Sequence, residues 1–334
     1  MTHRQGPRGS ANRKASAKGR SSFDVLVLAT MSAGKTSFVN ALIGTELLHT
    51  ANEATTACIT SVEHRQGARD FNGACYSYEN QELACLHNIA PSHVRNWNAN
   101  SDVKRITLSG SFRTSPSPAQ GLVLHDTPGP NNSQDTHHAQ LMLEAVRTVP
   151  FQALCYVLNA SQLGTQDDHA VLTQLRSELA LRPNRSIYFI LNKVDLLDPE
   201  KGEGIDAYVN NSHRYLTGIG FERPVIIPTM ASVALYARKV LNHHTLTRVQ
   251  RLKLRQTLIE FSEDKSALLR TAVVPDPIKK GMLKTLATLE RQRNARLLAG
   301  KCCEKNDLQQ LLTISGLKTI EALIKHQRQS IKNP

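Results

Sequence analysis

Residues 29–36 read ATMSAGKT and decide the fold class of this chain. They match the pattern G-x-x-x-x-G-K-[ST] of a phosphate-binding loop, with alanine in the first glycine position. In such a loop the second glycine lets backbone N–H groups close around phosphates, the lysine reaches the β and γ oxygens, and the last hydroxyl binds Mg²⁺. The candidate phosphate-binding residues are Ala33, Gly34, Lys35, Thr36 and Ser37, and Thr36 is also a candidate metal ligand.

The sequence on both sides places this loop between a strand and a helix. Residues 23–29 form a nearly continuous apolar run, which is typical of a parallel strand buried on both faces. Similar runs recur along the chain, with helical patterns between them, and this alternation predicts an α/β fold with a doubly wound, mostly parallel sheet. Residues 60–112 interrupt the alternation and predict extra strands and a short helix. The expected strands are 23–29, 121–125, 153–158, 187–191 and 224–227, and the expected helices include 35–43, 136–149, 168–181 and 231–241.

A second phosphate-reading motif follows the expected strand at 121–125. Residues 126–129 read DTPG, which matches D-x-x-G. In this motif the aspartate, here Asp126, holds Mg²⁺ through water, and the N–H of the glycine, here Gly129, contacts the γ-phosphate. Asp126 is therefore a candidate metal ligand.

A base-reading motif follows the expected strand at 187–191. Residues 192–195 read NKVD, which matches N-K-x-D. A carboxylate such as that of Asp195 accepts from the N1–H and the exocyclic amine of guanine, and adenine offers no such pair of donors on that edge. The candidate base-binding residues are Asn192, Lys193 and Asp195, so the sequence predicts GTP as the substrate and Mg²⁺ as the cofactor.

The motifs together resemble the dynamin superfamily of GTPases. Lys35 and Asp126 are 91 residues apart, which is longer than in a minimal small GTPase. Residues 32–35 (SAGK), 44–48 (GTELL) and 126–131 (DTPGPN) are similar to those of bacterial dynamin-like GTPases of the replication-clamp-binding type. The resemblance covers roughly residues 23–240, is weak over 60–112, and implies a GTPase that hydrolyses GTP to GDP and phosphate.

The resemblance also implies roles for individual residues. Thr56, with Thr55 as the alternative, would close on Mg²⁺ and orient the attacking water. Ser32 would contact the β–γ bridging oxygen, and Asp167 would belong to a loop that meets a second GTPase domain. Residues 229–232 would form the loop that closes over the guanine. The candidate catalytic residues are Ser32, Lys35, Thr56 and Asp167.

One departure bears on how hydrolysis would be activated. Pro130 follows Gly129, where small GTPases usually place a glutamine that orients water. This fits a family whose hydrolysis is stimulated when two GTPase domains pair, so we expect a transient homodimer. The alternative is a GTP-dependent binding switch with negligible turnover, acting on DNA-associated partners or an anionic surface. The resemblance also suggests a protein partner in replication or segregation.

Charge, composition and hydrophobic pattern divide the chain into three parts. Residues 1–22 resemble a basic, disordered arm, residues 23–245 a dynamin-type GTPase domain, and residues 246–334 a helical extension. Breaks are expected in the extension at Pro275–Pro277 and at Ser315-Gly316. Its last helix, from Leu317, resembles the one that closes such a GTPase domain, and the stalk of dynamins is expected to be absent.

The charge distribution and the cysteines suggest where the protein acts. Residues 1–20 carry a net charge of +6 and residues 235–334 a net charge of +12, against −5 for the part between them. These basic ends predict either attraction to nucleic acid or an anionic surface, or simply solvated termini. The six cysteines lack the C-x-x-C spacing of a metal or redox site, which favours a reducing cytoplasm. No run reaches the ~20 apolar residues of a transmembrane helix.

Overall fold

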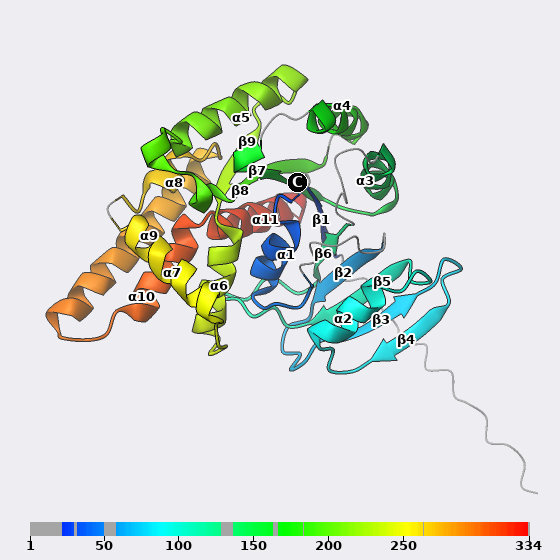
Figure 1. Cartoon of the computed structure of the whole chain (residues 1–334), viewed down its shortest axis with the longest axis horizontal. Helices are drawn as coiled ribbons and strands as arrows, with labels where there is room; N and C mark the ends of the chain where they lie inside the picture. The colour runs from blue at the N-terminus through cyan, green and yellow to red at the C-terminus, as the bar shows by residue number, and fades with distance from the viewer. Residues whose placement is uncertain are drawn as a thin grey trace, which may run out of the picture.

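A single large sheet organises the molecule (Figure 1). The computed structural model describes residues 22–29, 32–49, 58–127, 136–162, 166–182, 184–262 and 264–332. Within them the strand order is β4-β3-β5-β2-β6-β1-β7-β8-β9. The strands are β1 (Phe23–Ala29), β2 (Ile59–His64), β3 (Asn72–Tyr76), β4 (Glu82–Leu86), β5 (Arg105–Gly110), β6 (Leu122–Asp126), β7 (Ala153–Asn159), β8 (Ser186–Asn192) and β9 (Val225–Thr229).

Five neighbouring strands of this sheet run parallel. They are β6, β1, β7, β8 and β9, so all their carboxyl ends meet at one edge. Every residue of β1 and of β7 is buried, because helices cover both faces of this part of the sheet. The order of the strands along the chain reverses around β1, and such a point is where open α/β sheets bind ligands. The predicted mostly parallel α/β fold is confirmed.

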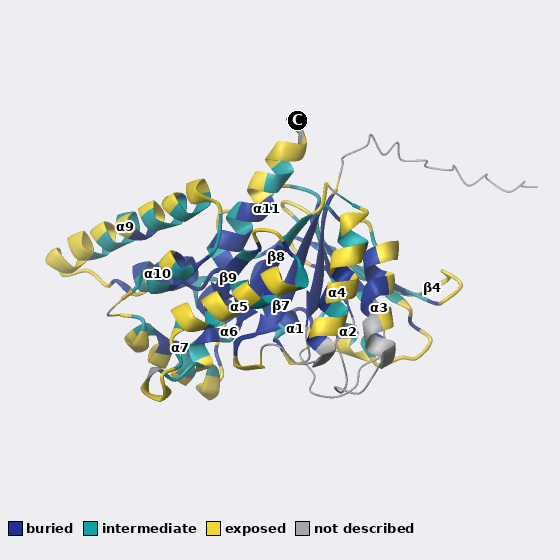
Figure 2. Ribbon diagram, turned by 90° about the horizontal axis from the view of Figure 1, so that it is seen from above, coloured by how far each residue is buried: buried dark blue, intermediate teal, exposed yellow. Residues whose placement is uncertain are grey.

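Helices cover the parallel strands on both faces (Figures 1 and 2). On one face, α3 packs against α4, and α4 against α5. On the other face, α1 contacts α6 and α11, and α6 contacts α10. The helices of these two layers are α1 (Lys35–Ile43), α3 (Thr136–Thr148), α4 (Gln166–Ala180), α5 (Ile205–Ile219), α6 (Ala231–Leu241), α10 (Glu304–Ile314) and α11 (Leu317–Lys332).

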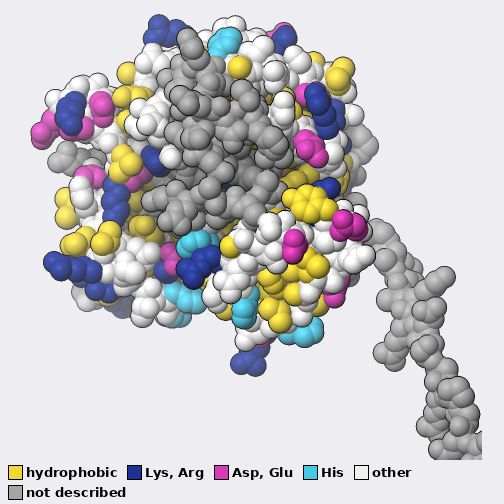
Figure 3. All heavy atoms as spheres, turned by 45° about the vertical axis from the view of Figure 1, so that its right-hand side comes forward, with side chains coloured by type: hydrophobic (Ala, Val, Ile, Leu, Met, Phe, Trp, Pro, Cys, Tyr) yellow, Lys and Arg dark blue, Asp and Glu magenta, His cyan; other side chains and the backbone are white. Residues whose placement is uncertain are grey.

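The interruption over residues 60–112 extends the same sheet. β2 joins β6 in the antiparallel direction, β5 pairs parallel with β2, and β3 and β4 complete the edge as antiparallel strands. The short helix α2 (Pro91–Asn98) packs on β5 and buries Val94 and Trp97. The prediction of extra strands and a short helix here is confirmed. On the face shown in Figure 3, which brings forward the side of the molecule where this extension lies, acidic and basic side chains are intermixed.

The C-terminal part is helical, as predicted, but it is broken more often than expected. It consists of α7 (Arg248–Glu260), α8 (Ala267–Thr271), α9 (Asp276–Leu298), α10 and α11. The breaks before α9 and before α11 lie at the predicted prolines and at Ser315-Gly316, whereas those between α7 and α8 and between α9 and α10 were missed. The second missed break contains Gly300 at a φ of 65°, the left-handed conformation that commonly ends a helix. Within the described ranges, no helix is both long and apolar enough to cross a bilayer.

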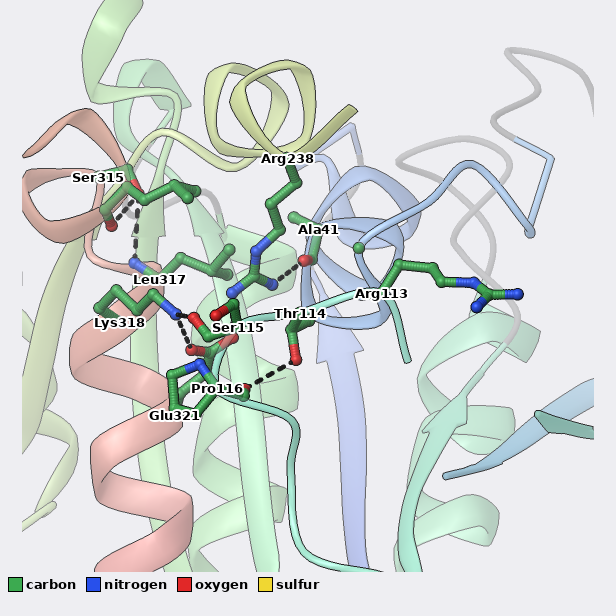
Figure 4. A network of polar contacts seen from close by, with 12 residues as sticks. Ala41, Arg113, Thr114, Ser115, Pro116, Arg238, Ser315, Leu317, Lys318 and Glu321 are labelled. Atoms are coloured by element: carbon green, nitrogen blue, oxygen red, sulfur yellow. Dashed lines mark hydrogen bonds and ion pairs between the residues drawn. The ribbon is translucent and has the colours of Figure 1, made fainter. Parts of the chain in front are cut away.

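A partly buried ionic network joins the first helix to the last one (Figure 4). The guanidinium of Arg238, on α6, donates to the carbonyl oxygen of Ala41 on α1 and to the Glu321 carboxylate on α11. Lys318, also on α11, donates to Glu321 at 3.0 Å and to the carbonyl oxygen of Ser115 at 2.6 Å. Arg238 is buried, so these hydrogen bonds replace the contacts with water that its guanidinium has lost. The network fixes α1, which begins at the phosphate loop, against the C-terminal helix.

Candidate nucleotide-binding site

The phosphate-loop motif lies at the carboxyl edge of the central strand. Ala29 is the last residue of β1 and pairs with Val157 of β7, so its backbone is extended. An extended residue needs no glycine, which explains how alanine is accepted in the first position of the motif. Ser32 is exposed, with a φ of 53°. The chain then enters α1 at Lys35.

Gly34 is required by both its conformation and its surroundings. It precedes α1 with a φ of 85°, a region that other residues rarely adopt. A Cβ atom on Gly34 would lie 2.6 Å from the side-chain nitrogen of Asn192. The first turn of α1 carries no acidic residue, so its free N–H groups and positive dipole face the loop without a local counter-charge. Thr36 and Ser37 are half-buried in this turn.

The first two phosphate-reading motifs contact each other through Lys35. Its ammonium group donates to a carboxylate oxygen of Asp126 and to the carbonyl oxygen of Thr127. The hydroxyl of Thr127 in turn donates to the carbonyl oxygen of Val27 at 2.9 Å, which fixes the end of β6 against β1. The structure therefore brings together a cationic group and a carboxylate that lie 91 residues apart in the sequence.

The base-reading motif is connected to the phosphate loop through Asn192. Its side-chain amide donates to the carbonyl oxygen of Ala33 at 2.7 Å. Its side-chain oxygen accepts from the backbone N–H of Ala231, at the start of α6, at 3.1 Å. Asn192 is 2% exposed, so it serves as an internal link between the loop and α6 rather than as a solvent-facing ligand.

Lys193 and Asp195 follow Asn192 in a short 3₁₀ turn. Lys193 adopts a φ of 68°, and this left-handed residue turns the chain away from the end of β8. Asp195 has an 8% exposed side chain and pairs with Lys253 of α7 at 3.0 Å. Burial raises the pKa of the Tyr236 hydroxyl, and the charges of Glu46 and Asp195 act in the same direction. Asp195 thus lies among polar partners contributed by α6 and α7.

The oxygen atoms at this edge fit a hard cation. Thr36 offers a hydroxyl and Asp126 a carboxylate, and Mg²⁺ favours oxygen ligands. In the described part of the chain, no cluster of three His, Cys, Asp or Glu side chains could hold a metal. A magnesium ion here would therefore depend on phosphate oxygens and water for the rest of its ligands, as is usual for Mg²⁺ bound with a nucleotide.

Several predicted residues lie outside the described ranges. These are Thr55, Thr56 and Gly129, and the side chain of Asp167 is also not described, although its backbone lies in the first turn of α4. The roles proposed for them stay predictions.

One sequence-based prediction on the guanine side is wrong in its local structure. Residues 229–232 are not a loop, because Thr229 ends β9 and α6 begins at Ala231. The single connecting residue, Met230, donates its N–H to the carbonyl oxygen of Ser315 at 3.0 Å. The segment is therefore a strand–helix junction held against Ser315, and its role at the guanine stays a prediction.

Sequence reasoning missed two residues near the site. Lys253 is 58 positions from Asp195, and no local pattern connects them.

The second missed residue, Cys58, precedes β2, and its thiol donates to a side-chain oxygen of Asn98 at 2.6 Å. Burial raises the pKa of this thiol to about 12, and the negative charge of Asp126 contributes in the same direction. Cys58 is therefore a neutral thiol at physiological pH and is poorly suited to act as a nucleophile or a metal ligand.

The fold and the site together define a phosphate-loop nucleotide-binding domain of the α/β class. The model of the dynamin family matches residues 25–194, which is half of the chain, and the protein belongs to this family. The family resemblance inferred from the motifs is thereby confirmed, at the level of the dynamin family.

Two solved structures are similar in fold. Both are described as an oligomerised bacterial dynamin pair that provides a mechanism for long-range sensing and tethering of membranes. Each is 18% identical, with a TM-score of 0.45, over 93% of this chain. The match covers 47% of one of those chains and 48% of the other, so this chain spans about half of their length. No curated protein matches this sequence.

Proposed function

We propose that this chain binds GTP together with Mg²⁺ and hydrolyses it to GDP and phosphate. The observation that carries the proposal is the direct contact between its motifs. Lys35 contacts Asp126, and Asn192 contacts Ala33. The phosphate-reading and base-reading segments therefore lie at one edge of the sheet, and membership of a family of GTPases supports the same conclusion.

Different residues at this edge would bind the phosphates and the Mg²⁺ ion, according to their side-chain chemistry. The Lys35 ammonium would exchange its contacts for the β and γ oxygens, next to the N-terminus of α1. Thr36 and Asp126 would hold Mg²⁺, which supplies charge neutralisation on the phosphates. Phosphoryl transfer of this kind depends mainly on positioning and electrostatic stabilisation. Ser32 and Thr56 are proposed to complete the site around the bridging oxygen and the attacking water.

Asp195 would provide the choice of base. Its carboxylate has no donor, so it favours a base edge that presents two donors, as guanine does. A site built to accept from such donors discriminates strongly against a base that lacks them. Asn192 and Lys193 would support this segment next to the phosphate loop.

Phosphate release by the purified full chain tests the proposal. We expect Mg²⁺-dependent release from GTP well above that from ATP, and loss of release in Lys35→Ala. Tight GTP binding without release at any protein concentration would instead favour the binding switch with negligible turnover. A protein that binds neither nucleotide, or both equally, would overturn the GTP assignment.

Self-association is a further part of the proposal. The sequence places Pro130 where a water-orienting side chain would otherwise lie, and this supports activation by a second GTPase domain through Asp167. Turnover per molecule should then rise with protein concentration by mass action, and Asp167→Ala should reduce that rise without much loss of binding. A flat specific activity would contradict pairing.

Four further predictions from the sequence stay predictions. They are the replication-clamp-binding subtype, a partner in replication or segregation, binding of the basic ends to nucleic acid or an anionic surface, and a cytoplasmic location.

A further inference from the structure

Lys253 holds the base-reading aspartate from a helix outside the matched family range. Its ammonium lies 3.0 Å from the carboxylate Oδ2 of Asp195 and donates to the backbone oxygen of the same residue at 2.9 Å. One cation therefore binds both the side chain and the main chain of Asp195. This double contact restricts rotation of the carboxylate relative to its own backbone.

The helix that carries Lys253 is itself firmly attached. Thr247 caps the N-terminus of α7 and forms a capping box with Gln250. The amide of Gln250 donates to Glu46 at 2.9 Å, and Glu46 pairs with Lys239 of α6 at 2.7 Å. Lys253 is 24% exposed and lies next to the buried Leu254. The ammonium is thus presented from an anchored helix, unlike a lysine on a solvated face.

The contact is compatible with recognition of a base. An ionised carboxylate has about four acceptor positions on its two oxygens. Two donors of guanine would use one position on each oxygen, and Lys253 uses one on Oδ2. Pairing with Lys253 therefore leaves room for both donors while it holds the carboxylate in one orientation, which reduces the ordering that base binding would otherwise require.

We propose that Lys253 is a positioning residue for guanine and sets how strongly the site prefers GTP over ITP. The inference rests on the proposed function. Hypoxanthine, the base of ITP, keeps the N1–H but lacks the exocyclic amine. A fixed Asp195 carboxylate accepts from the N1–H and from the exocyclic amine of guanine at the same time. A carboxylate that rotates can still accept from the N1–H, but it loses most of the bond to the exocyclic amine, which ITP does not have. Removing Lys253 should therefore weaken GTP more than ITP.

Competition of GTP, ITP and ATP against a fluorescent GTP analogue, on the full chain, tests this. In Lys253→Met we expect the GTP:ITP affinity ratio to fall roughly three- to tenfold, as for loss of part of one charge-assisted bond. Lys253→Arg should restore much of the ratio, because a guanidinium also donates to a carboxylate. Arg255→Met removes an exposed charge from the same helix and should match the wild type. Lys253→Gln serves as a second uncharged variant, and thermal unfolding checks that each one is folded.

The outcomes separate this inference from the proposed function. An unchanged GTP:ITP ratio in a folded Lys253→Met or Lys253→Gln variant would overturn the positioning role. A higher GTP affinity in these variants would also overturn it, because Lys253 would then be a competitor for Asp195. A wild-type protein that does not prefer GTP over ATP would refute the proposed function itself, whatever the Lys253 variants do.

Discussion

The side-chain amide of Asn192 donates a 2.7 Å hydrogen bond to the carbonyl oxygen of Ala33, across 159 positions of sequence. The same side chain accepts from the N–H of Ala231, so one buried residue fixes the phosphate loop, the end of β8 and the start of α6. This arrangement makes the base-reading and phosphate-reading segments one unit. A change at Asn192 should therefore affect both nucleotide binding and folding.

Asn192→Ala should lower the free energy of unfolding by about 1–3 kcal/mol, because it leaves a buried carbonyl and a buried N–H without this partner. GTP binding should weaken as well, since the loop loses its attachment. Chemical unfolding and titration of a fluorescent GTP analogue measure the two effects. Asn210→Ala, at an exposed position on α5, is the control and should leave both nearly unchanged. Wild-type stability in Asn192→Ala would contradict the linking role.

Gly34→Ala and Gly202→Ala separate backbone strain from lack of space. Both glycines have positive φ values, of 85° and 76°. Around Gly202 a Cβ meets no atom within 4 Å, whereas at Gly34 it would clash with Asn192. We expect Gly202→Ala to cost about 1 kcal/mol from strain, and Gly34→Ala to cost more and to weaken GTP binding. Equal effects on stability, with binding intact in both, would show that the loop can move away from Asn192.

The parts of the fold that the sequence predicts are those governed by local pattern. Runs such as 23–29 and 153–158 are apolar at every position because both faces are covered, and they appear as β1 and β7 with almost the predicted bounds. The missed break before α10 had one local signal, Gly300, while the break between α7 and α8 contains neither glycine nor proline. Local propensity therefore predicted the sheet better than the helical extension.

The candidate site shows the same limit at the level of side chains. Lys35 and Asp126 could be assigned to one phosphate and Mg²⁺ site because each belongs to a short motif, whereas their direct contact was not predicted. The role of Asn192 as a link to Ala33 could not be predicted, because it depends on how β8 approaches β1 through β7. The pairing of Lys253 with Asp195 depends on the path of α7, for which no motif exists. Motifs thus predict which residues belong to the candidate site, whereas the side-chain contacts between them depend on tertiary packing.

Glu321→Ala should destabilise the fold without a direct effect on nucleotide contacts. It removes the carboxylate partner of the buried Arg238 guanidinium, which would keep its bond to the carbonyl oxygen of Ala41. Loss of a hydrogen bond to a charged group costs about 1.5–3 kcal/mol. Urea unfolding measures this. Asp264→Asn breaks the exposed pair with Arg270 and should change stability little. If the two substitutions had equal effects on stability, the partly buried network would contribute no more than a surface pair.

Asp195→Asn should exchange the preferred base from guanine to xanthine. The amide can donate to the carbonyl that xanthine carries in place of the exocyclic amine, whereas it can no longer accept both donors of guanine. Loss of one charge-assisted bond should weaken GTP binding by about 1.5–3 kcal/mol, which is roughly ten- to a hundredfold. Lys253 also loses its ionic partner in this variant, so the protein should be slightly less stable. Competition titrations with GTP and xanthosine triphosphate, alongside thermal unfolding, measure these effects.

Leu196→Ala is a neighbouring control, since Leu196 is 57% exposed and carries no hydrogen-bonding side chain. Equal GTP affinity in Asp195→Asn and the wild type, with no gain for xanthosine triphosphate, would mean that residues 192–195 serve only as the end of β8.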